Sequence, residues 1–555
     1  MLFNFVYHIF IFTSIFYNIL PINTKPEPIT KLLTLPEGII RGVQTQITGV
    51  FRYTIPYARP PVSSLRWNDP VPPLKWSGIR SGIELPSACP QSLTNGFVIT
   101  NEDCLYLSVY VPDKIFKGMP IFVWVHGGSL LQGGASGYGL DGSSLAAKSG
   151  MIVIVVQYRL GLLGFLRTPS IRKTLSGNYG LKDLIMALKY IRKNAAYLGG
   201  DQNRITLAGQ SSGASLIKTL LTVKSASDLF QRAILHSCPL NYGDHSIRTS
   251  ELIGSVALSI LKPPGQDLRR VSVSDILAAQ NSMQDNLPSR LPGIANDEPF
   301  RPVIDGSLVT SDFINAINIP SFNLFGNERQ IIFTTVKDEA GPTVAESFEV
   351  NTPSVEFEPA LNASIASPDQ ERIKFITSSK VYSNELNNLI NRGVSDATRE
   401  ELTVFGTDYI WRCANQQVAV NLTTNSISLM NKQKIWIAEF NIGIPYNSTI
   451  NIKYCRSKVC HEDDILSVFG LPADRTPNEI STRLINEIQA RWAAFASFGN
   501  PNTLRLTPWY PVEGRNQLNL LRIDRKSTIS VAQQRPRACD ELWGVKARFD
   551  AQIYS

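Results

Sequence analysis

The chain has 555 residues, of which 43% are hydrophobic, and its mean hydropathy of -0.04 argues against a protein built from multiple membrane spans. The net charge of +8 is spread along the sequence with no dense basic run among aromatic residues, which disfavours nucleic-acid binding. No cysteine and histidine spacing is typical of a zinc site, and no glycine-rich phosphate-binding loop occurs, so we expect neither a metal nor a cofactor.

The N-terminus is strongly apolar and aromatic, and its first charged side chain is Lys25. We interpret residues 1–24 as a secretory signal peptide, which predicts a secreted, extracellular protein. The alternative is an uncleaved segment that anchors the protein, because about 20 apolar residues can span a bilayer. Residues 25–555 are expected to form a single domain, since no linker, repeat or low-complexity tract divides them.

Apolar, strand-like runs alternate with helix-like segments along most of the chain. The strand-like runs are residues 120–125, 151–157, 204–207, 233–235, 330–335 and 435–440, and a clear helical segment is 181–194. This alternation predicts an α/β fold with a large, mostly parallel, twisted central sheet that has helices on both faces. The stretch 345–430 is more polar, and its pattern indicates helices.

The strand-like run 121–125 leads into the turn His126-Gly127-Gly128-Ser129. Backbone N–H groups in such a turn can converge on a developing oxyanion, and each donor is typically worth roughly 3 to 4 kcal/mol of transition-state stabilisation. A glycine pair after a strand is common in ordinary loops. The turn therefore indicates an oxyanion hole only in combination with the motifs that follow it in the sequence.

Ser211 lies in the pentapeptide Gly209-Gln210-Ser211-Ser212-Gly213, directly after the apolar run 205–208. A strand followed by G-x-S-x-G is the sequence form of a nucleophile elbow, in which glycines leave room for a sharp strand-to-helix turn. A chain of this length would show such a pentapeptide by chance about 0.2 times, so a simple Ser/Gly-rich turn is the alternative. The elbow alone makes the chain a candidate serine hydrolase.

The strand-like run 330–336 ends in the acidic turn Lys337-Asp338-Glu339-Ala340-Gly341. A carboxylate there would face a site at the carboxyl edge of the sheet. It would accept the Nδ1 proton of a histidine and stabilise the imidazolium that forms during catalysis. By local reasoning, either Asp338 or Glu339 could serve.

The chain has five histidines, and hydrolases with this elbow carry the nucleophile, the acid and the histidine in that order. His461 fits this order, because it follows the acidic turn and lies in a loop between Cys460 and the apolar run 465–471. Two histidines precede Ser211, and two follow it too closely to leave room for an acid-bearing strand. These four are His8, His126, His236 and His245.

With these motifs in place, the chain resembles the type B carboxylesterase family, the cholinesterase-like branch of the α/β-hydrolase fold. The resemblance covers roughly residues 35 to 545. The stretches that carry it are FRYTIPYA at 51–58, NEDCLYL at 101–107, QYRLGLLGF at 157–165, GNYGLKD at 177–183, LGGD at 198–201 and KDE at 337–339.

The resemblance implies a role for each candidate residue. Ser211 would be the nucleophile, His461 the base, and Glu339 rather than Asp338 the acid. The N–H groups of the oxyanion hole would come from Gly128, Ser129 and Ser212. Acyl transfer by such a triad needs no cofactor.

The seven cysteines support export. The resemblance pairs Cys89 with Cys104 and Cys413 with Cys539, and the short spacing of Cys455 and Cys460 indicates a third disulfide that would brace the loop of His461. Cys238 is left over and is expected to be buried. Together with the leader and three glycosylation sequons, these pairs favour a secreted protein over one with reduced cytosolic thiols. The sequons are at Asn362, Asn421 and Asn447.

Three residues depart from the family pattern. Ser129 stands where a third glycine is usual, so we expect a backbone there that is free of strain for a non-glycine residue. Gln210 replaces a common glutamate and removes a negative charge near the imidazolium, and Ser212 stands where alanine is commoner. We interpret Gln210 as tuning rather than inactivation. The alternative function is a catalytically impaired esterase-like adhesion, storage or ligand-binding protein, because a fold does not fix its function, and Ser129 is the one feature that favours it.

We expect a secreted serine carboxylesterase that hydrolyses small-molecule or lipid-like esters through a Ser-His-Glu acyl-enzyme mechanism. We expect no stable membrane insertion after the leader is cleaved. The loop between Cys89 and Cys104 has 14 residues and no tryptophan, whereas cholinesterases carry a quaternary-ammonium-binding tryptophan in a longer counterpart. Choline esters are therefore disfavoured, and the lack of a long lid in this loop favours soluble esters over long-chain triglycerides.

Overall fold

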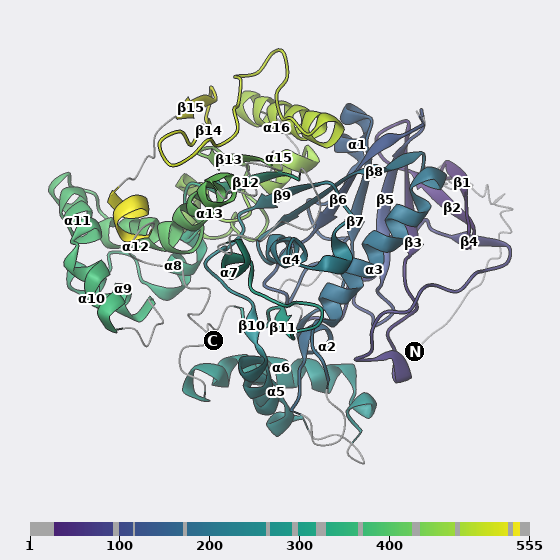
Figure 1. Cartoon of the computed structure of the whole chain (residues 1–555), viewed down its shortest axis with the longest axis horizontal. Coiled ribbons are helices and arrows are strands. Elements are labelled where there is room, and N and C mark those ends of the chain that lie inside the picture. Colours follow the sequence, from purple (N-terminus) through teal and green to yellow (C-terminus); the bar gives the residue numbers. More distant parts are fainter. Residues whose placement is uncertain are drawn as a thin grey trace, which may run out of the picture.

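The computed structural model (Figure 1) describes most of the chain. The described residues are 27–92, 99–114, 117–169, 175–261, 267–290, 298–317, 329–364, 370–424, 433–471, 478–530 and 537–543. The predicted leader, residues 1–24, lies outside them. Within these ranges, no helix combines the length and the apolar character needed to cross a bilayer.

One large sheet runs through the molecule. In the described residues it has 13 strands in the order β1-β2-β3-β5-β7-β6-β8-β9-β12-β13-β14-β15, with β4 beside β2. Their bounds are β1 Thr30–Leu35, β2 Gly38–Gln44, β3 Val50–Pro56, β4 Ile79–Ser81, β5 Tyr106–Pro112, β6 Met119–Val125, β7 Ile152–Val156, β8 Gly200–Gln210, β9 Arg232–His236, β12 Gln330–Val336, β13 Lys434–Phe440, β14 Leu520–Ile523 and β15 Thr528–Ser530. A separate pair consists of β10 (His245–Ser246) and β11 (Val303–Ile304).

The centre of the sheet is parallel, as predicted. Strands β7, β6, β8, β9, β12, β13 and β14 pair in parallel, and β6 and β7 are buried along their whole length. Near-continuous apolar runs are what strands covered on both faces require. The six predicted strands are therefore confirmed, and β8 is longer than its prediction.

Helices cover both faces of the sheet (Figure 1). Ile121 and Val123 of β6 belong to one hydrophobic core with helices α3 and α4, whereas Phe122 and Trp124 belong to a second core with α1, α15 and α16. The helices of the first half are α1 Ser143–Ser149, α2 Gly161–Phe165, α3 Tyr179–Asn194, α4 Ser212–Leu220, α5 Ile247–Ile260, α6 Val273–Arg290 and α7 Phe313–Ile317. This layering confirms the predicted fold class.

Residues 345–364 and 370–424, the described parts of the stretch 345–430, are mostly helical, as the sequence pattern indicated. They form much of a helical region at one end of the molecule, in green in Figure 1. The helices of the second half are α8 Gly341–Ser347, α9 Phe357–Ser364, α10 Gln370–Ser378, α11 Val381–Asn391, α12 Ala397–Thr407, the π-helical turn η7 Asp408–Arg412, α13 Cys413–Thr424, the 3-10 turn η8 Lys453–Ser457, α15 Ile465–Phe469 and α16 Glu479–Phe498.

Candidate active site

Ser211 occupies a sharp turn between β8, which ends at Gln210, and α4, which begins at Ser212. Its backbone has φ 55° and ψ -127°, a combination that costs a non-glycine residue about 1 to 3 kcal/mol and persists only where the surrounding structure enforces it. A Cβ at Gly213 would lie 2.3 Å from the Val125 carbonyl oxygen, so only glycine fits there. The Ser211 N–H donates to the His236 carbonyl oxygen at 2.9 Å. The sheet therefore fixes the elbow through its backbone.

The turn after β6 corrects one expectation. Ser129 has φ 55° and Leu130 has φ 57°, so both non-glycine residues adopt the left-handed conformation, and the expected strain-free backbone at Ser129 is wrong. Gly128 has φ 108°, and a Cβ there would lie 2.3 Å from the Gln132 carbonyl oxygen. The Leu130 N–H donates to Ser212 Oγ at 3.2 Å, which ties this turn to the elbow. The chain thus holds the turn in shape without the usual third glycine.

Glu339 and His461 lie 122 residues apart and form a close pair. His461 Nδ1 lies 2.5 Å from Glu339 Oε2, and the other oxygen of this carboxylate accepts the Val336 N–H at 2.8 Å. Glu339 is 1% exposed, so its carboxylate is fixed in place. The carboxylate of Asp338 has a different partner, because it accepts the Val459 N–H at 3.0 Å. Of the two carboxylates that the sequence left open, the one beside His461 is Glu339.

The environment of His461 favours its charged form. Burial alone lowers the pKa of this imidazole, but the charge of Glu339 and its hydrogen bond, with smaller contributions from Glu462 and Asp464, raise the pKa from 6.5 to about 9. The indole of Trp411 lies beside the ring, with centroids 5.5 Å apart. The site is thus built to stabilise an imidazolium.

Gln210 contacts the ring nitrogen of His461 that a catalytic base would use. The Gln210 side-chain nitrogen lies 3.0 Å from His461 Nε2, and Gln210 Oε1 is buried among the described residues with no hydrogen-bond partner. An amide nitrogen only donates, so this orientation requires a neutral Nε2 that accepts. The flipped amide would place Oε1 there to accept from an imidazolium. His461 Nε2 is therefore paired with Gln210 in this state rather than with the Ser211 hydroxyl.

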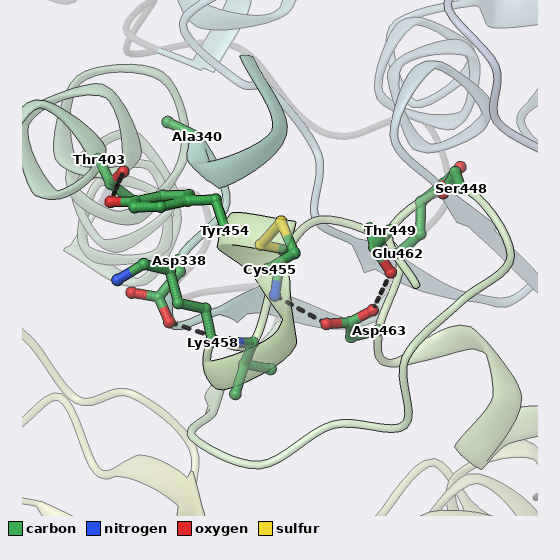
Figure 2. Close-up of a disulfide and its surroundings, with 12 residues drawn as sticks. Asp338, Ala340, Thr403, Ser448, Thr449, Tyr454, Cys455, Lys458, Glu462 and Asp463 are labelled. Carbon is green, nitrogen blue, oxygen red and sulfur yellow. Dashed lines mark hydrogen bonds between the residues drawn. A yellow bond between two sulfur atoms is a disulfide. The ribbon is translucent and has the colours of Figure 1, made fainter. Parts of the chain in front are cut away.

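Side chains brace the loop that carries His461 (Figure 2). The disulfide between Cys455 and Cys460 closes the segment just before it. Asp463 Oδ2 accepts the Cys460 N–H at 2.8 Å, and its other oxygen accepts from the Thr449 hydroxyl at 2.6 Å. Asp338 pairs with the chain at Cys460 through an isolated bridge. The loop has almost no regular structure, so these contacts position the imidazole.

The other cysteines also pair as expected. The structure joins Cys89 to Cys104 and Cys413 to Cys539, while Cys238 is free and buried. Burial raises the pKa of the Cys238 thiol to about 12, which leaves it unreactive. Of the three sequons, Asn362 and Asn447 are exposed, and Asn421 is half-buried. Disulfides of this kind are typical of the secretory pathway.

Two adjoining cavities lie over the candidate residues. The first, about 480 Å³ in volume, is lined by Ser211, Glu339, His461 and Trp411 among others. The second, about 500 Å³, reaches Gln210. We call them the triad chamber and the side chamber. They share lining residues from the loop between Cys89 and Cys104, the turn after β6 and the His461 loop, namely Ser92, Gly128, Gln132, Ser448 and Glu462.

A buried polar cluster behind the elbow was missed at the sequence level. His236 Nδ1 lies 2.7 Å from Asp464 Oδ2, and His236 Nε2 lies 3.0 Å from Trp492 Nε1. The Trp492 indole N–H only donates, so His236 Nε2 is the acceptor. The ring proton of His236 is therefore on Nδ1, which donates a hydrogen bond to Asp464. One signal was available, because His236 ends a strand that neighbours β8 and lies opposite Gln210. The cluster links the strand beside the nucleophile to the loop of the base.

The parallel sheet, the strained elbow and the Glu339–His461 pair together define an α/β-hydrolase. A family model described as "Carboxylesterase family" matches residues 29–543, and the chain belongs to this family. This membership confirms the expected class of enzyme, a carboxylesterase.

Individual relatives agree with the family assignment. The chain is 28% identical over 525 residues to the para-nitrobenzyl esterase of Bacillus subtilis (strain 168), covering 88% of this chain and 94% of that protein. It is 40% identical over 216 residues to a human cocaine esterase, which covers 36% of this chain and 37% of the relative. A solved structure of a PNB esterase superposes with a TM-score of 0.72 at 25% identity, covering 92% of this chain and all of that one.

Proposed function

We propose that this protein is a secreted serine carboxylesterase in which Ser211 is the nucleophile, His461 the general base and Glu339 the residue that orients it. The observation that carries the proposal is the meeting of three separate segments at the triad chamber. They are the strained elbow, the acidic turn after β12 and the disulfide-braced loop. Strain at the elbow is what a site built for function retains.

The mechanism is a two-step acyl transfer. His461 takes the Ser211 proton as the hydroxyl attacks the ester carbonyl, then gives it to the departing alcohol, and water repeats both steps on the acyl-enzyme. The N–H groups of Gly128, Ser129 and Ser212 bind the oxyanion. Ser212 begins α4, so its N–H is a donor with no acceptor within the helix.

The hydrogen bond between Gln210 and His461 Nε2 must break before this chemistry begins. His461 Nε2 is paired with the Gln210 amide here, and catalytic hydrogen bonds often form only when substrate is bound. A shift of His461 Nε2 from Gln210 to Ser211 prepares the base. After this shift the Nε2 proton goes to the departing alcohol, Nδ1 stays paired with Glu339, and Gln210 is left as a neutral neighbour of the imidazolium.

The substrates we propose are soluble carboxylic esters. The short loop between Cys89 and Cys104 disfavours choline esters and long-chain triglycerides. We propose that the protein is secreted after residues 1–24 are removed, and the three disulfides support secretion. We also propose that residues 25–555 act as one domain. Glycans at Asn362, Asn421 and Asn447 are part of this proposal.

Two observations favour a second candidate, a binding protein that keeps the scaffold without the activity. The left-handed Ser129 and the pairing of Gln210 with His461 both depart from a fully prepared site. A protein of this kind would bind an ester-like ligand in the chambers without turnover.

Labelling with a fluorophosphonate separates the two candidates. We expect an adduct on Ser211, located by peptide mass spectrometry, together with hydrolysis of short-chain nitrophenyl esters. The Ser211→Ala variant should lose both while keeping the melting temperature of the parent. Folded protein that gives neither adduct nor turnover would favour the binding candidate.

A further inference from the structure

Glu462 follows the candidate base and has an unusual backbone. Its φ of 80° lies in the left-handed region, which L side chains other than asparagine and aspartate rarely adopt. Such a conformation costs free energy and persists only where the surrounding structure enforces it, often at a functional site. Glycine would occupy this position without strain. The chain therefore bears a cost to place a carboxylate beside His461.

The Glu462 side chain lies in the wall between the two chambers. It lines both of them, together with Ser448. The Ser448 hydroxyl donates to Glu462 Oε2. Figure 2 shows the two side chains close together, to one side of the disulfide. A carboxylate has about four acceptor positions, so this one contact orients the group and leaves it free to accept others.

The chambers are acidic although the protein is basic. Among the described residues that line them there is no lysine or arginine, whereas Glu298 and Glu346 line the triad chamber in addition to Glu462. The chain as a whole has a net charge of +8. The pKa of Glu462 is raised overall, chiefly by burial and also by the nearby Asp464, although the charge of His461 and the Ser448 hydrogen bond act against this rise. A bound cation would favour the ionised carboxylate in the same way.

Position relative to the base indicates which part of an ester would meet Glu462. In acyl transfer the base gives its proton to the leaving alcohol oxygen, so the alcohol departs from the side of the histidine. Glu462 is the next residue along the chain and faces the same chamber as His461. The group that meets its carboxylate therefore belongs to the alcohol.

We infer that Glu462 is a specificity-determining residue that selects esters whose alcohol carries a protonated amine, by accepting a hydrogen bond from its N–H group. This inference rests on the proposed esterase function and names the substrate class of that same site. A charge-assisted hydrogen bond in a partly enclosed site accounts for the preference. A quaternary ammonium has no N–H and would gain only the weaker attraction of its charge.

The test compares two esters of the same shape. 2-(Dimethylamino)ethyl butyrate is protonated at pH 7, and 3-methylbutyl butyrate is its neutral counterpart. We expect the parent protein to show a kcat/KM ratio of about tenfold or more in favour of the amine, the size of one charge-assisted hydrogen bond. Both esters meet the same state of His461, so changes in the base cancel in this ratio.

Two variants at one position keep the test clear. Glu462→Gln retains the shape and loses the charge, and Glu462→Gly relaxes the left-handed backbone, so it should fold at least as well as the parent. Both should bring the ratio near one. The control is Glu349→Gln, which removes an exposed glutamate outside the chamber linings and should leave the ratio unchanged. The quaternary trimethylammonium ester should show a smaller preference than the tertiary amine.

Some outcomes would overturn the inference while leaving the esterase proposal in place. These are Ser211-dependent hydrolysis of both esters with a parent ratio near one, a ratio that Glu462→Gln leaves unchanged, or an equal preference for the quaternary ester. If neither ester is hydrolysed, the esterase proposal fails on its own. Equilibrium binding of the two esters to Ser211→Ala protein, with and without Glu462→Gln, then still decides whether the carboxylate selects the amine.

Discussion

The nucleophile elbow and the His461 loop are held by opposite means. At the elbow, Ser211 is fixed by backbone, because β8 and α4 meet there and Gly213 lies against the carbonyl groups of Val125 and His126. In the loop, His461 is fixed by side chains, namely a disulfide and the carboxylates of Asp463 and Glu339. One half of the site depends on the sheet and the other on individual contacts.

This difference determines what a substitution does. A side chain added at an elbow glycine disturbs the packing of the central sheet and should affect folding and activity together, whereas Ser211→Ala removes only the hydroxyl and should leave the fold intact. A change in the loop removes one contact among several and should affect activity more than folding. The following variants test that separation.

The largest effect should come from His461→Gln. Loss of a catalytic base lowers kcat by about 10⁴- to 10⁶-fold in comparable triads. Because the ring lies at the chamber wall, circular dichroism and melting temperature should stay close to the parent. His236→Gln is the matched control, since His236 is buried and lies outside both chamber linings. It should keep turnover within about tenfold while lowering the free energy of unfolding through lost hydrogen bonds. An equally deep loss of kcat at His236 would contradict the assignment.

Glu339→Gln should lower kcat by about 10⁴-fold, by analogy with loss of the orienting acid in a serine triad. It should also change the pH profile. His461 acts as a base only when neutral, so kcat/KM of the parent should rise with pH through the pKa of about 9. Without the Glu339 charge this rise should move to lower pH.

Stability gives an independent readout of the same pair. The pKa of His461 is raised above the ordinary 6.5, so the pair stabilises the fold fully below about 6.5 and loses this contribution as pH rises toward 9. Chemical denaturation of the parent should show this decline. A parallel decline in Glu339→Gln would argue against the pairing.

Gly213→Ala should damage folding and activity together. The added Cβ would lie 2.3 Å from the Val125 carbonyl oxygen, and relief of that clash should cost roughly 3 kcal/mol of unfolding free energy and displace Ser211. Gly393→Ala is the control, because Gly393 has φ 74° with no atom within 4 Å of the added Cβ. Its cost should be about 1 kcal/mol, from the left-handed backbone alone, with activity kept.

The smallest effects on activity should come from the two disulfides, which should differ in their effects on stability. Cys455 and Cys460 are separated by 5 residues, whereas Cys413 and Cys539 are separated by 126. In the chain-entropy model the first disulfide stabilises by about 2 kcal/mol and the second by about 5 kcal/mol. We expect a double serine variant at 455 and 460 to lose several-fold in kcat with a modest change in melting temperature. The variant at 413 and 539 should show the reverse, and equal patterns would remove the distinction between the two regions.

The sequence predicted best what local patterns determine. The strands of the parallel core read as apolar runs, and the elbow reads as G-x-S-x-G, because a buried strand and a tight turn each restrict the residues that fit. Strand β1 was missed, since its residues are mostly exposed or half-buried and its pattern is weak. The order of the strands within the sheet could not be read from these local patterns, because the parallel strands pair with segments distant in the sequence.

The details of the site depended on side-chain direction, which the sequence did not contain. Asp338 and Glu339 are adjacent, and only tertiary contacts decide that one accepts a backbone N–H while the other reaches His461. The pairing of Gln210 with His461 and the left-handed φ values of Ser129 and Glu462 arise in the same way. Neighbouring segments enforce these conformations against local preference.

The position of His236 has a further consequence for motion. Its backbone carbonyl holds the N–H of Ser211, and its ring holds Asp464 on the segment that follows His461. One residue therefore serves as a common anchor for both reacting partners. We therefore expect any displacement of the end of β9 to carry the serine and the segment beside the imidazole in the same direction.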